Sequence, residues 1–221
     1  MTLLIIRHGE TPLNVARVLQ PANTPLSARG LAQAAALARR LAAADPAALP
    51  RQTADPAALP RPVAIVSSDL PRALQTAQAI AAACGLTVLT STLLHERNFG
   101  QLRGLPYDSL GFDPLSSEAA APGGESLSDF KARCRQAWAW VLAQHTALGG
   151  PMAVVTHGLV ILEWLQHGPL VLPADLELPE RLANTSVTLA SAGAPHRVQQ
   201  VNRCDHLSGL TAEDGQSLSG G

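Results

Sequence analysis

The chain has 221 residues, a formal net charge of −1 and a hydrophobic fraction of 47%. This length is enough for one sizeable α/β domain, and this hydrophobic fraction excludes a globally disordered chain. The near-neutral charge excludes a general attraction to nucleic acid or to an anionic membrane, and no apolar stretch approaches the roughly 20 residues that span a bilayer. We therefore expect a globular protein that binds neither nucleic acid nor membrane.

Short apolar runs alternate along the chain with stretches rich in alanine and leucine. The apolar runs predict strands at residues 3–6, 63–66, 86–89 and 152–155, and two late strands at 187–189 and 197–201 that pair antiparallel at a sheet edge. Capping and stop residues place the helices at about residues 27–44, 70–84, 126–148 and 159–167. The expected N-terminal caps are Ser27, Ser68 with Asp69, and Ser126.

This alternation predicts an α/β fold, a three-layer α/β/α sandwich with a mostly parallel central sheet. We expect one domain over residues 1–210, because no linker divides the chain. A Ser- and Gly-rich tail at 211–221 should be disordered.

Two stretches depart from the alternation. The octapeptide ADPAALPR occurs at residues 44–51 and again at 54–61. Its paired prolines forbid a regular helix or a central strand, so we expect a surface loop insertion without a function. Residues 91–125 are irregular, contain scattered Gly and Pro, and are too long for a passive connection. We expect this second stretch to form a lid over an active site.

Chemically active side chains follow three of the predicted strands. Arg7 and His8 follow the first, Arg72 comes shortly after the second, and His157 follows the fourth. The carboxyl ends of parallel strands meet at one edge, where ligands of such sheets bind. Arginines bind phosphate oxygens through paired N–H donors, and a neutral imidazole can attack phosphorus. A proton donor for the leaving alkoxide is also needed, and Glu96 in the irregular stretch is the best placed.

Five sequence blocks resemble the histidine phosphatase superfamily, which has the phosphoglycerate-mutase-like fold. In the family's order, the blocks are residues 4–11 with Asn14, 67–77, 96–104, 123–126 and 154–158. Weaker similarity continues at residues 184–187 and 202–207. The resemblance therefore covers nearly the whole chain.

The resemblance implies roles for single residues. His8 would be the phosphorylated nucleophile and Glu96 the proton donor, with Arg7, Arg72 and His157 in the phosphate pocket. Asn14 would bind a phosphate oxygen, and the secondary substrate contacts would be Gln20, Thr24 and the backbone of Gly158. The chain departs from the family at Asn23, where relatives often have Asp, which puts only the hydrogen bonding of that turn in doubt.

Several alternatives compete with these roles. Glu10 and Glu125 are other carboxylates near the motifs, and Glu10 could instead organise the loop after His8. A metal site of His8, His157 and Glu96 is conceivable from the residue types, but the neighbouring arginines would repel a dication. We expect no metal and no cofactor. The other histidines should be ordinary surface or capping residues: His95, His145, His167, His196 and His206.

Three functions are compatible with this set of residues. The first is a histidine acid phosphatase-type phosphomonoesterase that is metal-independent and hydrolyses a small phosphomonoester through a phosphohistidine on His8. The alternatives are a cofactor-dependent phosphoglycerate mutase and a non-catalytic protein that binds a phospholigand. Mutases of the family carry a Lys/Arg-rich insert before Gly123, whereas here residues 99–124 contain Arg103 as the single basic residue. This difference favours the phosphatase.

The partner implied by these residues is a small phosphorylated metabolite. Cys84, Cys134 and Cys204 have no paired or zinc-like spacing, which is typical of a reducing compartment. We expect no signal peptide, because charged residues interrupt the first apolar run. We therefore expect a cytoplasmic protein, either a monomer or a homodimer.

Overall fold

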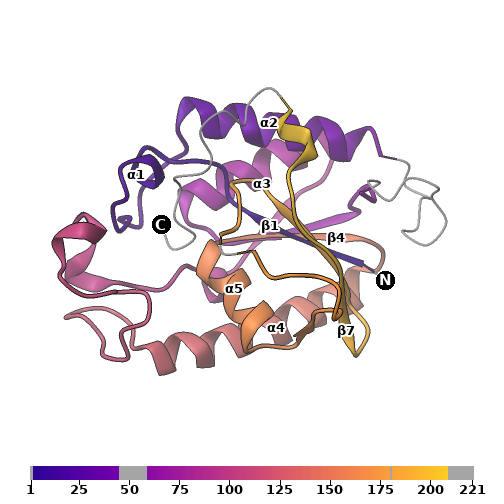
Figure 1. Ribbon diagram of the computed structural model, residues 1–221. Helices are drawn as coiled ribbons and strands as arrows, with labels where there is room; N and C mark the ends of the chain where they lie inside the picture. The colour runs from indigo at the N-terminus through magenta and orange to yellow at the C-terminus, as the bar shows by residue number, and fades with distance from the viewer. Residues whose placement is uncertain (1, 45–58, 180, 209–221) are drawn as a thin grey trace.

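The computed structural model describes residues 2–44, 59–179 and 181–208 (Figure 1). Its seven-stranded sheet has the order β3-β2-β4-β1-β6-β7-β5. The strands are β1 Thr2–Arg7, β2 Ala64–Ser67, β3 Val88–Thr90, β4 Met152–Thr156, β5 Leu170–Val171, β6 Val187–Ser191 and β7 His196–Arg203. The helices are α1 Pro12–Val15, α2 Ala28–Ala42, α3 Pro71–Cys84, α4 Leu127–Leu148 and α5 Gly158–Gln166. The expected α/β/α sandwich is confirmed.

The strands β3, β2, β4 and β1 are parallel neighbours, so their carboxyl ends lie at one edge of the sheet. The late strands β6 and β7 pair antiparallel as predicted, but β6 also pairs antiparallel with β1. The two-residue strand β5 lies outside β7 and was not predicted. Two apolar residues are too few to stand out as a strand in a sequence.

The sheet lies between two helical layers, with α2 and α3 on one side and α4 and α5 on the other (Figure 1). Alternate residues of β1 face opposite layers. Leu3 and Ile5 of β1 pack with Phe130, Trp138 and Trp164 of α4 and α5. Leu4 and Ile6 face the other layer, where they join the core formed by α2 and α3. Because both faces of the sheet are covered, the central strands are apolar throughout.

The capping predictions had mixed outcomes. Ser27 and Ser126 cap α2 and α4, each accepting a hydrogen bond from a backbone N–H in the first turn. At α3 the prediction was wrong, because the cap is Leu70, which makes no side-chain capping bond. Proline at the first position of α3 needs no partner for an N–H. The hydroxyl of Ser68 accepts a hydrogen bond from the N–H of Leu70 at 3.2 Å and also lies 2.9 Å from Nε2 of His157.

Most of the duplicated octapeptide lies outside the described residues, but the end of its second copy is packed against the domain. Leu59 is 6% exposed and joins the core between the sheet, α2 and α3. Arg61 donates hydrogen bonds to the carbonyls of Ala42 and Cys84, at the C-terminal ends of α2 and α3. Leu59 and Arg61 therefore fix this end of the predicted surface loop to α2 and α3.

Candidate active site

Two histidines follow directly on neighbouring parallel strands. Arg7 ends β1 opposite Thr156 of β4, and the backbone N–H of His8 donates to the Thr156 carbonyl at 3.0 Å. This register places His8 beside His157, with ring centroids 5.1 Å apart and ring planes at 59°. Both side chains are fully buried. The sheet itself therefore sets the spacing of the two imidazoles.

The imidazole of His8 has a defined orientation. Its Nδ1 lies 2.7 Å from the carbonyl oxygen of Gly9. Because a carbonyl oxygen can only accept a hydrogen bond, Nδ1 must carry the proton. In the neutral ring, the lone pair is then on Nε2. Nε2 of His8 is consequently the nitrogen that can attack phosphorus.

The loop after His8 is held close to α2. A Cβ atom on Gly9 would lie 2.7 Å from the carbonyl oxygen of Gly30, so only glycine fits there. The carboxylate of Glu10 accepts a hydrogen bond from the Ser27 hydroxyl at 2.8 Å, and its backbone N–H donates to the side chain of Gln33. Glu10 therefore organises this loop and does not compete as the acid.

Arg7 and Arg72 add positive charge beside the histidines. Arg7 is fully buried and donates to the carbonyl of Leu182, and Arg72 is 2% exposed and donates to the carbonyl of Pro21 at 3.5 Å. Burial lowers the pKa of Arg72 to about 10, helped by the nearby charges of Arg103 and Arg7 and opposed by Glu96. Arg72 is still a cation at neutral pH. Two buried guanidiniums favour an anionic ligand.

Glu96 enters the site from the irregular stretch. Its side chain is buried, and its two oxygens accept hydrogen bonds from the backbone N–H groups of Arg97 and Leu159 at 3.0 and 3.2 Å. Burial raises the pKa of Glu96 to about 7, although these two bonds and the charges of Arg72 and Arg133 oppose the shift. A carboxyl group with this pKa can both give and accept a proton at neutral pH.

Burial also lowers the pKa of His157 well below its ordinary value, and the charges of Arg72 and His8 add to the shift. The ring of His157 is therefore neutral at neutral pH. Its Nε2 lies 2.9 Å from the hydroxyl of Ser68, and within the described part of the chain its buried Nδ1 has no hydrogen-bond partner. A neutral ring can donate a hydrogen bond to a phosphate oxygen without repelling the arginines.

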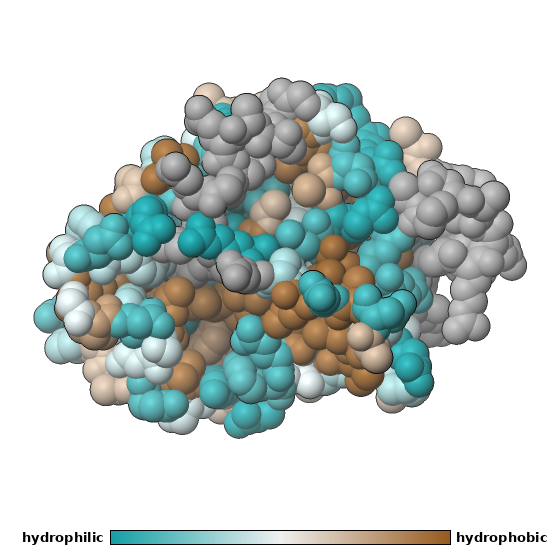
Figure 2. Space-filling view, in the orientation of Figure 1, coloured by the Kyte–Doolittle hydropathy of each residue, from teal (hydrophilic) through white to brown (hydrophobic). Residues whose placement is uncertain are grey.

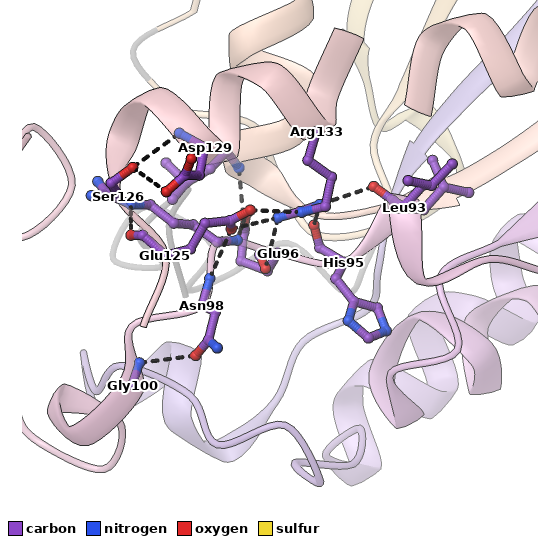
Figure 3. A network of polar contacts seen from close by, with 12 residues as sticks. Leu93, His95, Glu96, Asn98, Gly100, Glu125, Ser126, Asp129 and Arg133 are labelled. Atoms are coloured by element: carbon purple, nitrogen blue, oxygen red, sulfur yellow. Dashed lines mark hydrogen bonds and ion pairs between the residues drawn. The ribbon is translucent and has the colours of Figure 1, made fainter. Parts of the chain in front are cut away.

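An arginine of α4 holds the backbone that carries Glu96 (Figure 3). Arg133 donates to the carbonyls of Leu93, His95 and Glu96 at 2.9, 2.7 and 3.3 Å. The same guanidinium makes a bidentate pair with both oxygens of Glu125 at 2.9 and 2.8 Å. Glu125 thus serves Arg133 and does not act as a second acid. Sequence reasoning missed Arg133, since the bonds by which it holds the Glu96 segment go to backbone carbonyls.

The rest of the irregular stretch is folded on itself. Arg97 points away from the site and donates to the carbonyls of Pro114, Leu115 and Ser117. Gly100 has a φ of +52°, and a Cβ atom there would lie 2.3 Å from the carbonyl oxygen of Pro122. These contacts give residues 96–125 a defined shape without a long helix or a strand.

An apolar groove lies next to this stretch. Its volume is about 460 Å³, and its apolar lining comes from Leu115, Leu127, Phe130, Leu159 and Leu162. Figure 2 shows apolar surface gathered on this face of the molecule, over α4 and α5. Leu159, whose N–H binds Glu96, connects the groove to the site.

The predicted substrate contacts differ in whether they have a hydrogen-bond donor available for a ligand. Asn14 and Gln20 are buried, and within the described residues their side-chain nitrogens have no hydrogen-bond partner. The hydroxyl of Thr24 donates to the carbonyl of Pro21 at 2.9 Å, so its proton is already used. Gly158 is the first residue of α5 and contributes the N-terminal end of a helix that follows His157.

The weak similarity near the C-terminus corresponds to supports of the His8 loop. The side chain of Asn184 and the backbone N–H of Thr185 both donate to the carbonyl of His8, at 3.1 and 3.2 Å. Asn202 accepts from the N–H of Ala183 at 2.7 Å, and His206 lies 3.0 Å from the hydroxyl of Thr185. These residues therefore support the backbone of His8 and the segment that binds it.

Two features are absent from the described residues, a cluster of metal ligands and a helix that could span a membrane. In the ranges that the structure describes, no three His, Cys, Asp or Glu side chains come together as metal ligands. None of the described helices is long and apolar enough to cross a membrane.

Comparisons with known proteins agree with this geometry. The model of the histidine phosphatase superfamily (branch 1) matches residues 3–202. A probable phosphoglycerate mutase GpmB of Yersinia pestis (strain Pestoides F) is 33% identical over 198 residues, which are 85% of this chain and 83% of the relative.

Two solved structures are also similar. A mycobacterial glucosyl-3-phosphoglycerate phosphatase in complex with inorganic phosphate is 30% identical, with a TM-score of 0.67 and coverage of 93% of this chain and 98% of the other. A phosphoglycerate mutase from Bacillus anthracis str. Sterne has a TM-score of 0.70 at 23% identity and covers 95% and 96% of the two chains. The last likeness concerns the fold alone.

Proposed function

The chain belongs to the histidine phosphatase superfamily, and we propose that it is a metal-independent phosphatase acting through a phosphohistidine on His8. Its substrate is a small phosphomonoester. The observation that carries this proposal is the orientation of His8, whose protonated Nδ1 faces the Gly9 carbonyl and leaves Nε2 as the nucleophile. A cytoplasmic location and a phosphorylated metabolite as the partner belong to the same proposal.

In the first step, the phosphate of the ester binds to Arg7, Arg72 and His157, whose donors stabilise the charge on its equatorial oxygens. The side-chain nitrogens of Asn14 and Gln20 are further donors. His8 Nε2 forms a bond to phosphorus while the bond from phosphorus to the ester oxygen breaks. Glu96 gives its proton to the leaving alkoxide. The products are phosphohistidine, an alcohol and the Glu96 carboxylate.

In the second step, the Glu96 carboxylate removes a proton from water as the water oxygen attacks phosphorus. The P–N bond breaks, the electron pair returns to Nε2, and inorganic phosphate leaves. Glu96 is protonated again at the end of the cycle. Its pKa of about 7 suits both roles, because the group must be an acid in one step and a base in the next.

Arginine chemistry supports the absence of a metal from this mechanism. Arg7 and Arg72 supply the positive charge that a metal ion supplies in other phosphatases. Arg7 directly precedes His8, and the charge of Arg72 acts on His157. We expect full activity in excess chelator. Loss of activity that added metal restores would contradict the metal-independent mechanism.

A phosphoglycerate mutase is the second candidate, and the named function of the Yersinia pestis relative favours it. Against it, Arg103 is the single basic residue in residues 99–124, so little would hold a second phosphate. A panel of phosphorylated metabolites, assayed for phosphate release and for isomerisation with and without 2,3-bisphosphoglycerate, separates the two. We expect phosphate release that does not depend on the bisphosphate. Rapid isomerisation with negligible release would make the protein a mutase.

A further inference from the structure

The apolar groove next to residues 96–125 begins at the proposed proton donor. Leu159, in the first turn of α5, donates its backbone N–H to a carboxyl oxygen of Glu96 at 3.2 Å, and Leu159 also lines the groove. Leu115, from the irregular stretch, is a second lining residue, and both leucines pack against the same small core cluster. A group bonded to the leaving oxygen at Glu96 therefore has this groove beside it.

The side of α5 that forms the groove changes from apolar to polar with distance from Glu96. Four lining residues share one face of this helix at a spacing of three or four: Leu159, Leu162, Glu163 and Gln166. Leu159 and Leu162 are half-buried and come first. Because a helix rises about 1.5 Å per residue, Gln166 lies about 10 Å further along the axis than Leu159. The groove is thus apolar where it meets the site.

The charges that line the groove do not favour an anion. They comprise three acidic and two basic residues: Asp113, Glu118, Glu163, Arg97 and Lys131. The guanidinium of Arg97 is already engaged, because it donates to backbone carbonyls of the irregular stretch. The leucine side chains have no hydrogen bond to offer to the hydroxyls of a sugar. The groove therefore fits a neutral, apolar group, and its volume of about 460 Å³ is typical of small-molecule pockets.

We infer that this groove is a leaving-group subsite, which binds an apolar chain of the alcohol while the phosphate lies at Arg7, Arg72 and His157. The inference rests on the proposed function and narrows its substrate to a phosphomonoester of an alkyl or similarly apolar alcohol. The occupant is the substrate itself, since the apolar end of the groove meets the carboxyl group that protonates the leaving oxygen. Binding removes the apolar surface of both the chain and the leucines from water.

Ethyl phosphate and hexyl phosphate form a matched pair of probes, because both have an unactivated primary alcohol as leaving group and differ only in chain length. In the wild-type protein, kcat/KM for phosphate release should be about ten- to a hundredfold higher for hexyl phosphate. Each methylene that is fully removed from water contributes up to about fourfold, and burial in a groove is partial. Equal kcat/KM values for the two esters would overturn the inference.

Two substitutions of Leu162 test the groove from opposite directions. Leu162→Ser removes apolar surface one turn away from Leu159, and it should lower the ratio of the two kcat/KM values by about threefold or more. Leu162→Trp fills the groove and should lower the same ratio even if the first variant is unstable. Leu148→Ser is the matched control, because Leu148 is 53% exposed at the other end of α4, outside the groove. An unchanged ratio in both Leu162 variants would overturn the inference.

Binding to the His8→Ala background separates this inference from the proposed function. Calorimetric titration of the two esters into His8→Ala and His8→Ala/Leu162→Ser measures recognition of the chain without turnover. Tighter binding of hexyl phosphate that is lost with Leu162, in a protein whose wild type hydrolyses neither ester, would keep the subsite and reject the phosphatase. Hydrolysis of both esters with equal kcat/KM and equal binding would keep the phosphatase and reject the subsite.

The oligomeric state, measured by light scattering, tests the other occupant that an apolar groove can have. We expect the wild-type protein and Leu162→Ser to have the same mass in solution. A wild-type dimer that dissociates in Leu162→Ser would assign the groove to a second copy of the chain and overturn the inference.

Discussion

Two regions of the molecule bring side chains to the same site by different physical means. The ends of β1 and β4 carry His8 and His157, whose positions are set by a ladder of backbone hydrogen bonds between buried parallel strands. Residues 91–125 carry Glu96, and this stretch has no regular ladder of strand hydrogen bonds. Here Arg97 and Arg133 replace the ladder by binding backbone carbonyls.

The two regions are expected to contact different parts of the substrate: the strand ends contact the phosphate, and residues 91–125 contact the leaving group. Phosphate has the same shape in every phosphomonoester, so a rigid strand-end frame can bind it in every case. The leaving group varies between substrates, and the groups that meet it are held on a loop whose shape depends on a few side chains. The ends of β1 and β4, which we call the frame, should therefore determine whether phosphate is transferred. Residues 91–125, which we call the loop, should determine which alcohol is released and how the rate depends on pH.

The largest expected effect is on the frame. His8→Ala removes the proposed nucleophile, and we expect turnover to fall by about 10⁴-fold or more, since nucleophile removal in other enzymes has effects of this size. The measurement is phosphate release from the best substrate of the panel, with thermal unfolding as a check of folding. His167→Ala, at an exposed histidine paired with Glu163, is the control and should keep full activity. A His8→Ala protein within tenfold of the wild-type rate would contradict the mechanism.

The next largest effect is expected at Glu96, the proposed acid in residues 91–125. Glu96 must be protonated to serve the leaving alkoxide, and its pKa is raised to about 7, so kcat/KM should fall tenfold per pH unit above about pH 7. In Glu96→Gln this descending limb should disappear, and the rate with an alkyl phosphate should fall by about 10²- to 10⁴-fold.

An activated aryl phosphate sharpens this test, because its leaving group departs without a proton. With that substrate the loss in Glu96→Gln should be much smaller in the first step. Glu118→Gln removes another carboxylate of the same loop and should leave the pH profile unchanged. An intact descending limb in Glu96→Gln would mean that another group is the acid.

A smaller effect is expected when the loop loses the hydrogen bonds from Arg133. Arg133→Gln removes the donors that hold the carbonyls of Leu93, His95 and Glu96. Misplacement of the acid by about an ångström should lower kcat by up to about a hundredfold, with a lesser change in KM. The loss should be larger for the alkyl phosphate than for the aryl phosphate, which a general loss of stability would not produce.

Two further variants of α4 support this test. Arg133→Lys restores the charge but not the bidentate pair with Glu125, and we expect partial rescue. Arg135→Gln changes an exposed arginine of the same helix and should have no effect. Equal losses on both substrates in Arg133→Gln would indicate a structural role only.

The smallest effect concerns the duplicated octapeptide. Deleting residues 52–61 removes the packed Leu59 and Arg61, but it joins an identical Ala-Leu-Pro-Arg sequence at 48–51 to Pro62. Leu49 and Arg51 of the first copy should then take the places of Leu59 and Arg61, and turnover should stay within about twofold of wild type. Arg51→Ala in the deletion variant removes the replacement for Arg61 and should lower the melting temperature. A large loss of activity in a folded deletion variant would show that the insertion has a function.

The frame could be predicted from the sequence because short apolar runs and the residues directly after them are enough to identify it. Apolar runs indicate buried strands, and parallel strands bring the residues that follow them to one edge. These two rules are enough to place Arg7, His8 and His157 together. Glu96 was selected as the best-placed acid of the irregular stretch, but nothing in its local pattern fixes where that stretch returns to the sheet, so its role depends more on the family resemblance.

The supports of the site could not be predicted. Arg133, Asn184 and Asn202 act by binding backbone groups of segments far away in the sequence, and such contacts leave no spacing pattern. Ser68 was predicted only as a helix cap, and its hydroxyl does accept a hydrogen bond from the N–H of Leu70 just before α3. Its second contact, with His157, joins segments far apart in the sequence and could not be predicted.

The most direct test of the account is to identify the phosphorylated residue. Wild-type protein is mixed with its substrate, quenched rapidly in alkali, which preserves phosphohistidine, and digested for mass spectrometry. We predict phosphate on the peptide that contains His8, at a steady-state level that rises in Glu96→Gln with the aryl phosphate, because the base for the second step is missing. A protein that turns over without a phosphorylated His8, or with the phosphate on another residue, would contradict the account.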